Sequence, residues 1–472
     1  MRSVSSIAVM ACLALAGCAT PRLADVRLPA AYEGPANVAP PGAIALDRWW
    51  TAYGDDQLNT LVDQALMRNP DVRTASARLD EVKAQRTGAI LQYLPQGDAQ
   101  GSARKTHTEQ LSGTTANIPG FSTSGTSKNY SANFNVSWEV DPWGRAFFAY
   151  KAADAEVDRA RFAYELARAS IAAETADAYF QARGLSIQLA DALQTVRIRQ
   201  QIYDLADKRG KAGIAATSEA DRVAADLAQA QSQVAGLEAQ LQVQKRAILI
   251  LAGRIVEPTA NISAPPEVGA PPPVPAAVPS ELLERRPDVR QAQAAVRSAA
   301  GQQTLAQLAF FPTFTFSPGI GWSKIEQPGF SSETENWILG GSVLQPILSS
   351  PRLMSELKAQ NARTEQAVTA YEKTVQTAFQ ESEAALVSLD ADRRQVTILA
   401  DGEVRAQRAF KAQALGYQHG VTNLDDLLTA EQNWRVIRVQ LAAAQVQALR
   451  RSVQAYKALG GGWPAQAYAQ VK

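Results

Sequence analysis

The chain has 472 residues, with 47 basic and 46 acidic residues and a formal net charge of +1. This balance argues against a nucleic-acid-binding surface, which needs an excess of basic residues. Both cysteines, Cys12 and Cys18, lie near the start, so the rest of the chain has no disulfide and no cysteine metal site. We find no Ser/His/Asp set, phosphate-binding loop or zinc-ligand spacing, and we predict no catalytic, cofactor-binding or metal site.

Residues 1–17 have the pattern of an export signal, with a basic residue before a short apolar core. The core ends in Leu15-Ala16-Gly17-Cys18, which resembles a bacterial lipobox and implies that Cys18 is lipidated. The alternative is an ordinary signal peptide that happens to contain a cysteine. Ala19 follows in place of an aspartate, which by resemblance to bacterial lipoproteins favours sorting to the outer membrane. Residues 18–55 are then a lipid anchor and an N-terminal tether, rich in Pro, Ala and Gly over most of its length.

Residues 56–253 are predicted to form the first of two repeats. Short helices come first, and a β-hairpin is expected at about 94–140 because apolar and polar residues alternate there. A long helix is predicted over 143–210, where strong helix formers dominate. At about 1.5 Å per residue this helix would be roughly 100 Å long. A second helix is predicted over 217–252.

The second repeat is predicted at 281–460, after a proline-rich linker at 254–280 that cannot be regular helix or central strand. This repeat is expected to have the same order of elements as the first. It comprises short helices, a β-hairpin at about 311–346, a long helix at 351–416 and a helix at 422–459. A C-terminal tail at 461–472 closes the chain.

Two sets of matching residues indicate the duplication. Asn69-Pro70-Asp71-Val72-Arg73 recurs as Arg286-Pro287-Asp288-Val289-Arg290, and its prolines and aspartates suit the first turn of a helix. Further along, one constant spacing relates four residues in the first repeat to four in the second: Arg145, Glu174, Gly213 and Gly253 correspond to Arg352, Glu381, Gly420 and Gly460. Gly213 and Gly420 therefore mark equivalent turns, each at the end of a long helix.

The four strands leave two interpretations open. One is a half-buried sheet packed on the helices. The other is a membrane β-barrel, in which apolar residues face outward, polar residues face inward and aromatic residues lie at the interfaces. Because about eight strands is the small end for a closed barrel, four strands would require the chain to oligomerise. The predicted membrane-facing aromatic residues are Phe134, Trp138, Phe314, Phe316, Trp322 and Trp337.

Several motifs together resemble one family. They are the lipobox, Asn69-Pro70-Asp71, the run from Trp138 to Arg145, Arg286-Pro287-Asp288-Val289, Gln345-Pro346-Ile347 and Gly460-Gly461-Gly462-Trp463. With the two-copy order of elements, they resemble the outer-membrane efflux proteins typified by TolC. More narrowly, they resemble the NodT-type lipoproteins that serve resistance-nodulation-division (RND) pumps. The chain departs from the family pattern at Asp141-Pro142-Trp143 and at Ser349-Ser350-Pro351.

The resemblance implies a mainly α fold with a membrane β-barrel portion. Three copies would contribute four strands each to a 12-stranded outer-membrane barrel, and their long helical hairpins would form an α-barrel in the periplasm. The implied function is passive conduction of small molecules across the outer membrane. The implied partners are two further copies of the chain, a periplasmic adaptor protein, an inner-membrane RND pump and outer-membrane lipid, with no nucleic acid. The alternatives are the exit duct of a type I protein secretion system and a periplasmic scaffold lipoprotein without a pore.

The resemblance also implies residue roles near the two turns. Asp425, Asp426 and Leu427 would form a channel constriction, and Tyr417, Asp221 and Thr422 would make the contacts that close it. The alternative reading of Asp425 and Asp426 is local, because carboxylates in the first turn of a helix interact favourably with its dipole. Both roles can coexist.

Overall fold

The computed structural model describes residues 24–34, 38–39, 46–109, 111, 125–213, 216–275 and 279–462. It divides into two compact units. The first, here called the sheet unit, comprises Met1–Ala24, Asp80–Arg159 and Gln293–Ala370. The second, the hairpin unit, comprises Asp25–Leu79, Ala160–Ala292 and Tyr371–Lys472. The division falls within helices α3 (Pro70–Leu91), α4 (Arg145–Lys211), α7 (Pro287–Leu308) and α8 (Ser350–Gln418).

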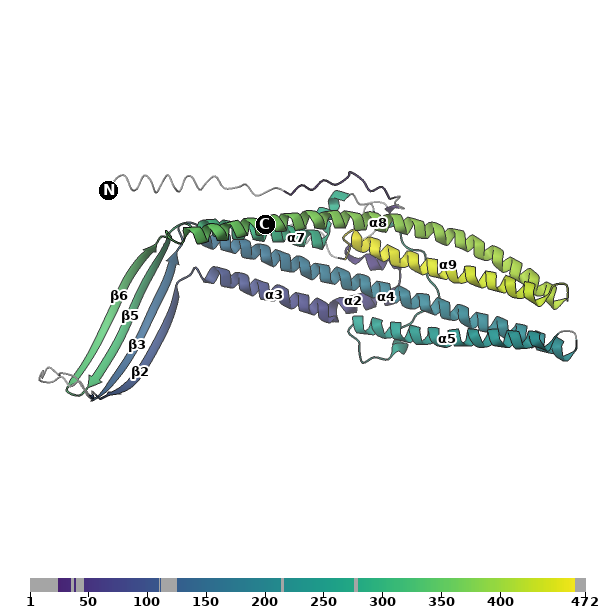
Figure 1. Ribbon diagram of the computed structural model, residues 1–472, viewed down its shortest axis with the longest axis horizontal. Helices are drawn as coiled ribbons and strands as arrows, with labels where there is room; N and C mark the ends of the chain where they lie inside the picture. The colour runs from purple at the N-terminus through teal and green to yellow at the C-terminus, as the bar shows by residue number, and fades with distance from the viewer. Residues whose placement is uncertain are drawn as a thin grey trace. The chain divides into compact units, whose positions relative to one another are not determined.

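The sheet unit contains one antiparallel sheet of four strands. These are β2 (Gln96–Thr108), β3 (Gly125–Val140), β5 (Thr313–Gln327) and β6 (Phe330–Leu344), in the order β2-β3-β5-β6 (Figure 1). The two hairpins predicted from alternating residues therefore join into a single sheet through β3 and β5. β2 and β6 form its edges.

Two long helical hairpins dominate the hairpin unit. One pairs α4 with α5 (Thr217–Leu251), and the other pairs α8 with α9 (Leu424–Ala458). Both hairpins turn at the same end of this unit (Figure 1). Among the described residues, no helix is both long enough and apolar enough to cross a bilayer.

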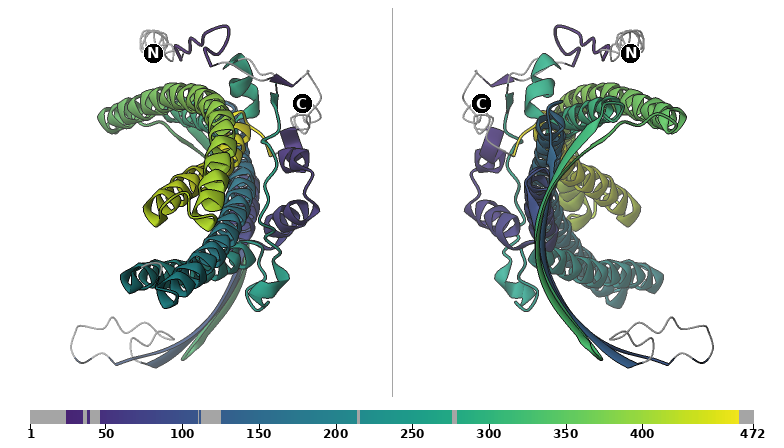
Figure 2. Two further views of the ribbon diagram at one scale, coloured as in Figure 1. Left: turned by 90° about the vertical axis from the view of Figure 1, so that its right-hand side faces the viewer. Right: turned by 90° about the vertical axis from the view of Figure 1, so that its left-hand side faces the viewer.

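Short elements pack beside the long helices of the hairpin unit. η1 (Leu46–Tyr53) and α2 (Asp56–Arg68) lie along one side of them (Figure 2). The remaining short elements are β1 (Val38–Ala39), η2 (Thr259–Asn261), β4 (Val274–Pro275), η3 (Pro279–Glu281) and α6 (Leu282–Arg285), and β1 pairs with β4 in parallel.

The main hydrophobic core lies in the hairpin unit and includes part of the predicted tether. Trp49 and Trp50 of η1 are buried there, and the Trp49 ring stacks on Tyr456 of α9 with a centroid distance of 5.6 Å. Ala172 and Ala176 of α4 are buried in the same core, where their small side chains allow close helix packing. The last residues of the predicted 18–55 segment are therefore packed against the long helices.

The internal repeat is visible in matching contacts. At the end of α5, the Asn69 side chain donates a hydrogen bond to the Leu251 carbonyl at 3.1 Å. At the end of α9, Arg286, the residue that matches Asn69, donates to the Ala458 carbonyl at 3.2 Å. These two side chains satisfy carbonyls that have no partner within their helix. Gly253 and Gly460 then leave the two helices with φ of +69° and +78°.

Candidate functional site at the hairpin turns and on the sheet

One apolar cluster joins the two hairpins next to their turns. Its buried members come from all four long helices: Ile202 from α4, Val223 from α5, Tyr417 from α8, and Leu424 and Leu427 from α9. Burial of this apolar surface favours the arrangement in which the four helices converge. We call it the turn cluster.

The predicted turn glycines both adopt left-handed backbone conformations. Gly213 has φ of +70° and Gly420 has φ of +75°, and an added Cβ would meet no atom within 4 Å at either position. Gly416 differs, because a Cβ there would lie 2.8 Å from Cγ2 of Thr422. The Thr422 hydroxyl donates to the Gln413 carbonyl at 3.2 Å, so Thr422 folds the turn back onto α8.

Tyr417 is only 2 % exposed and lies against Arg209 of the other hairpin. The guanidinium carbon of Arg209 lies 4.8 Å from the centroid of the ring, a cation–π geometry. Burial raises the pKa of the Tyr417 hydroxyl. Asp221 is exposed on α5. Within one chain, Arg209 of the other hairpin contacts Tyr417, and the predicted contact of Tyr417 with Asp221 stays a prediction.

The three predicted constriction residues separate into two groups. Asp425 and Asp426 are exposed in the first turn of α9, where Asn423 caps the helix by accepting a hydrogen bond from the Asp426 amide at 2.8 Å. Asp425 also pairs with Arg222 of α5 at 2.7 Å. Leu427 is only 3 % exposed and packs in the turn cluster. Leu424 and Leu427 lie about one helical turn apart and point inward together in the single chain. The predicted role of Leu427 in a channel constriction stays a prediction.

Charged contacts between α4 and α9 extend away from the turn cluster. Arg199 lies 3.5 Å from Glu431, a carboxylate that is only 1 % exposed. Asp191 pairs with Arg438. Burial raises the pKa of Asp191, although Arg438 beside it acts in the opposite direction.

These contacts were not predicted from the sequence. Their spacing offered little signal, because the paired residues of α4 (Arg199, Asp191 and Asp177) and those of α9 (Glu431, Arg438 and Arg450) do not recur at equal intervals. Asp177 and Arg450 continue the series with two hydrogen bonds of 2.7 and 3.0 Å. Such series join the two hairpins along much of their length.

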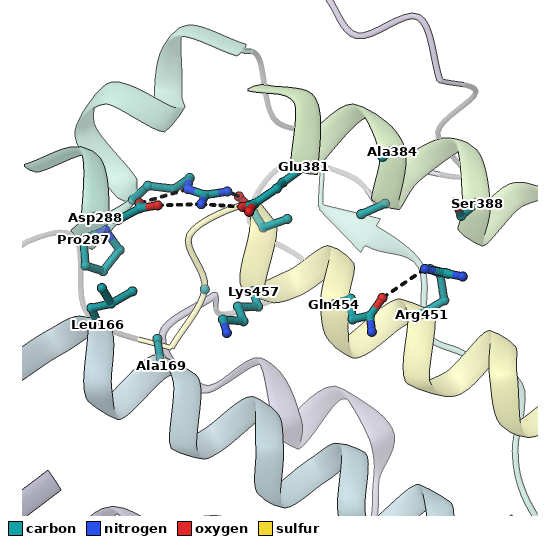
Figure 3. Close-up of a pocket in the computed structure, with 14 residues that line it drawn as sticks. Leu166, Ala169, Pro287, Asp288, Glu381, Ala384, Ser388, Arg451, Gln454 and Lys457 are labelled. Carbon is teal, nitrogen blue, oxygen red and sulfur yellow. Dashed lines mark hydrogen bonds and ion pairs between the residues drawn. The ribbon is translucent and has the colours of Figure 1, made fainter. Parts of the chain in front are cut away.

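A second unpredicted polar feature surrounds Arg286, which is buried at the start of α7. Its guanidinium bonds to Asp288 at 2.6 Å and to Glu381 of α8 at 2.7 Å, as Figure 3 shows for the two carboxylates. A cavity of about 390 Å³ lies beside it, lined in part by Ala384, Arg451 and Lys457. In the described part of the chain, no group of three or more His, Cys, Asp and Glu side chains is arranged to hold a metal.

Near its middle, the sheet separates most apolar residues from most polar residues by face. Adjacent strands align Phe134 with Ile320 and Trp337, and Trp138 with Phe316. The same register and the period of two place all six predicted aromatic residues on one face. Trp337 is 79 % exposed there. The opposite face carries amides, hydroxyls and glycines, including Asn133, Gly321 and Asn336 in one row. We call these the aromatic face and the polar face.

The prediction for Cys18 lies outside the described residues.

Comparison with known proteins gives one consistent result. The family model for "Outer membrane efflux protein" matches residues 61–254 and 278–461. The chain is similar to the pyoverdine export outer membrane protein OpmQ of Pseudomonas aeruginosa, with 30 % identity over 98 % of this chain and 97 % of that protein. It is also similar to nodulation protein T of Rhizobium leguminosarum bv. trifolii, with 26 % identity over 96 % of each protein.

Among solved structures, the chain resembles the outer-membrane channel OprN, with a TM-score of 0.80 and 26 % identity. The match covers 94 % of this chain and all of the OprN chain. The open state of the MtrE channel of Neisseria gonorrhoeae also has the same fold, with a TM-score of 0.80. This match covers 95 % of this chain and 99 % of the MtrE chain, at 24 % identity.

Proposed function

This chain belongs to the outer membrane efflux protein family, and we propose that it is the outer-membrane channel of a tripartite efflux system. In this proposal it conducts small molecules passively from an inner-membrane RND pump and a periplasmic adaptor protein to the outside. Cys18 anchors the mature chain by lipid, the sheet enters the outer membrane, and the helical hairpins extend into the periplasm.

The observation that carries the proposal is the division of the sheet into two faces. The aromatic face suits contact with lipid, whereas the polar face suits contact with water, as in membrane β-barrels. A single chain supplies four strands, and closure needs about eight or more. Three copies would supply twelve strands and leave no open edge. A scaffold lipoprotein without a pore has no need for such an exposed aromatic face.

The proposal predicts that the purified protein is a trimer that conducts ions. Native mass spectrometry in detergent should give the mass of three chains, and the same material in a planar lipid bilayer should give discrete current steps. A trimer that produces no steps would favour the scaffold alternative. A stable monomer would contradict closure of a barrel from several copies. An exit duct for secreted protein would also conduct, and co-purification with an RND pump rather than an ATP-driven transporter separates those two roles.

Lipidation predicts a specific N-terminal peptide. In the mature protein, mass spectrometry should find diacylglycerol on Cys18, because Cys18 ends the lipobox. Acyl chains contribute about 0.8 kcal/mol of membrane binding per buried CH₂, so the lipid should hold the chain at the membrane. Cys18→Ala should release more of the protein from the membrane fraction, while Cys12→Ala, within the predicted signal, should leave the mature mass unchanged. An unmodified N-terminus at another residue would contradict the proposed anchor.

The charged turn offers a site for gating. In a trimer, three copies of Asp425 and Asp426 would surround a common axis and concentrate negative charge there. The pair between Asp425 and Arg222 joins the two hairpins at this end, as does the contact between Arg209 and Tyr417. We expect opening to separate such contacts and closing to restore them, as a shift between two packings.

A further inference from the structure

The two edges of the sheet have complementary side chains. Within the described residues, β2 pairs with β3 alone and β6 pairs with β5 alone, so each edge presents a row of free backbone groups. Exposed edges of this length promote pairing with another chain. Since neighbouring strands alternate in direction, β6 of one copy would meet β2 of the next as an antiparallel pair.

On the aromatic face, the two edge strands differ in size and charge. β2 carries small residues there, followed by a cation: Gly97, Ala99, Gly101, Ala103 and Lys105. β6 carries two anions, followed by larger apolar residues and a glycine: Glu333, Glu335, Trp337, Leu339, Gly341 and Val343. Large residues beside small ones, and anions beside a cation, are favourable cross-strand neighbours.

Lys105 has an unfavourable neighbour within its own chain. It lies directly opposite Lys128 of β3, and like charges in opposed positions destabilise a strand pair. Lys128 has a carboxylate nearby, since its ammonium lies 3.6 Å from Glu326. On its other side, Lys105 faces the open edge, where an anion from a second copy would offset this repulsion.

The strand ends restrict the register of such a seam. Asp98, Asn135, Gly319 and Ile338 lie in one row across the four strands. From this row, β2 extends only to its first residue, Gln96, whereas β6 extends further, to its last residue, Leu344. We define the stagger of a seam as the number of residues by which a row shifts along β2 when it passes from one copy to the next. A stagger of about four residues places Gln96 of the next copy opposite Leu344 and Thr108 opposite Ser332, so that all of β2 is paired. The stagger has to be an even number of residues, because an odd one would exchange the two faces.

Barrel geometry selects the same stagger. Three seams with a stagger of about four give a total shear of about twelve for twelve strands. The ratio of shear to strand number is then about one, as in an eight-stranded barrel with a shear of eight, whose strands tilt by about 36°. A stagger of about two halves that ratio and gives a tilt of roughly 20°, whereas outer-membrane barrels tilt by about 35–45°.

We propose that β6 of one copy pairs with β2 of the next in the register that sets Glu335 opposite Lys105. The same register sets Trp337 beside Ala103 and Leu339 beside Gly101, so each large side chain meets a small one. This inference rests on the proposed trimeric channel and deepens it by naming the contacts that join the copies. The Lys105–Glu335 pair and the size match together select one register for the seam.

A cysteine pair tests the register in the full-length chain. The mature protein is expected to have no thiol other than the lipidated Cys18, so an added pair has a clean background. Opposed residues have Cα atoms about 4.5–5.5 Å apart, within the range for a disulfide. Mild oxidation of Lys105→Cys combined with Glu335→Cys should give dimers and trimers that survive denaturing electrophoresis and disappear on reduction.

Two matched pairs report on other registers. Lys105→Cys with Glu333→Cys should cross-link at least fivefold less, because it requires a stagger of about two. Lys105→Cys with Thr334→Cys should cross-link as weakly, because Thr334 lies on the polar face. More efficient linkage through Glu333 would overturn the proposed register. Absence of linkage in all three pairs, in protein that is trimeric by native mass spectrometry, would overturn the seam but leave the channel intact.

Charge reversal provides a second measurement if a cysteine variant does not assemble. Lys105→Glu should lower the fraction of trimer that resists mild heating by about fivefold, and Glu335→Lys in the same chain should restore it. Failure of the double variant to recover would contradict the pairing of these two residues. If the unmodified protein is not a trimer at all, the proposed function fails with it.

Discussion

Replacing Arg286 with methionine is expected to destabilise the hairpin unit by about 3 kcal/mol. Methionine fills much of the same volume but removes the hydrogen bonds to Asp288, Glu381 and the Ala458 carbonyl. Loss of one partner from a buried ion pair costs more than the pair contributes, because the remaining charge stays poorly solvated. Glu381 is half-exposed and can regain water, so we expect the lower end of the usual 3–5 kcal/mol range.

Denaturant unfolding in detergent, followed by circular dichroism, would measure this loss. Arg285→Ala is a matched control, because Arg285 is the preceding residue and its ion pair with Glu281 is only partly buried, with side chains 34 % and 41 % exposed. That substitution should cost less than about 1 kcal/mol. Arg286→Met with Glu381→Gln should recover part of the stability, since it removes one unpaired charge. Equal midpoints for wild type and Arg286→Met would show that this ion cluster contributes no net stability.

Replacing Asp425 and Asp426 with asparagine is expected to reduce the preference of the channel for cations by roughly fivefold. In a trimer the change removes six carboxylates from one end of the channel, and it leaves Arg222 without its partner. Asparagine keeps the size of the side chain and does not disturb the Asn423 cap, whose hydrogen bond involves the Asp426 backbone. Reversal potentials across a KCl gradient would measure the ratio of K⁺ to Cl⁻ permeability.

Asp221→Asn is the matched control for this experiment, because it removes an exposed carboxylate from α5 near the same turn. It should change the permeability ratio by less than about twofold. Leu427→Ala is a separate control for packing. It should destabilise the turn cluster by about 2–5 kcal/mol, as expected for a buried leucine. If the double asparagine variant retains wild-type selectivity, the selectivity site lies elsewhere in the channel.

The sequence by itself determined the type and order of the main elements, because these depend on local patterns. Strict alternation produced the four strands and assigned Phe134 and Trp337 to one face. Long stretches of helix formers produced α4 and α8, and Gly213 and Gly420 marked the turns after them because their backbones need positive φ. The matching motifs at Asn69 and Arg286 revealed the repeat, and both residues cap equivalent helices.

Only the tertiary structure decided which side chains meet. Whether α9 turns Leu427 inward, and whether Tyr417 meets Arg209 or Asp221, depends on how each helix is rotated about its axis and how the hairpins align. Arg199 meets Glu431 although more than two hundred residues separate them, so no local pattern specifies the pair. Trp49 likewise packs in the main hydrophobic core because Tyr456, which is far away in sequence, provides an apolar partner. Burial stabilises such contacts only after the helices have packed. The amino-acid composition alone cannot select one partner among the many that are possible.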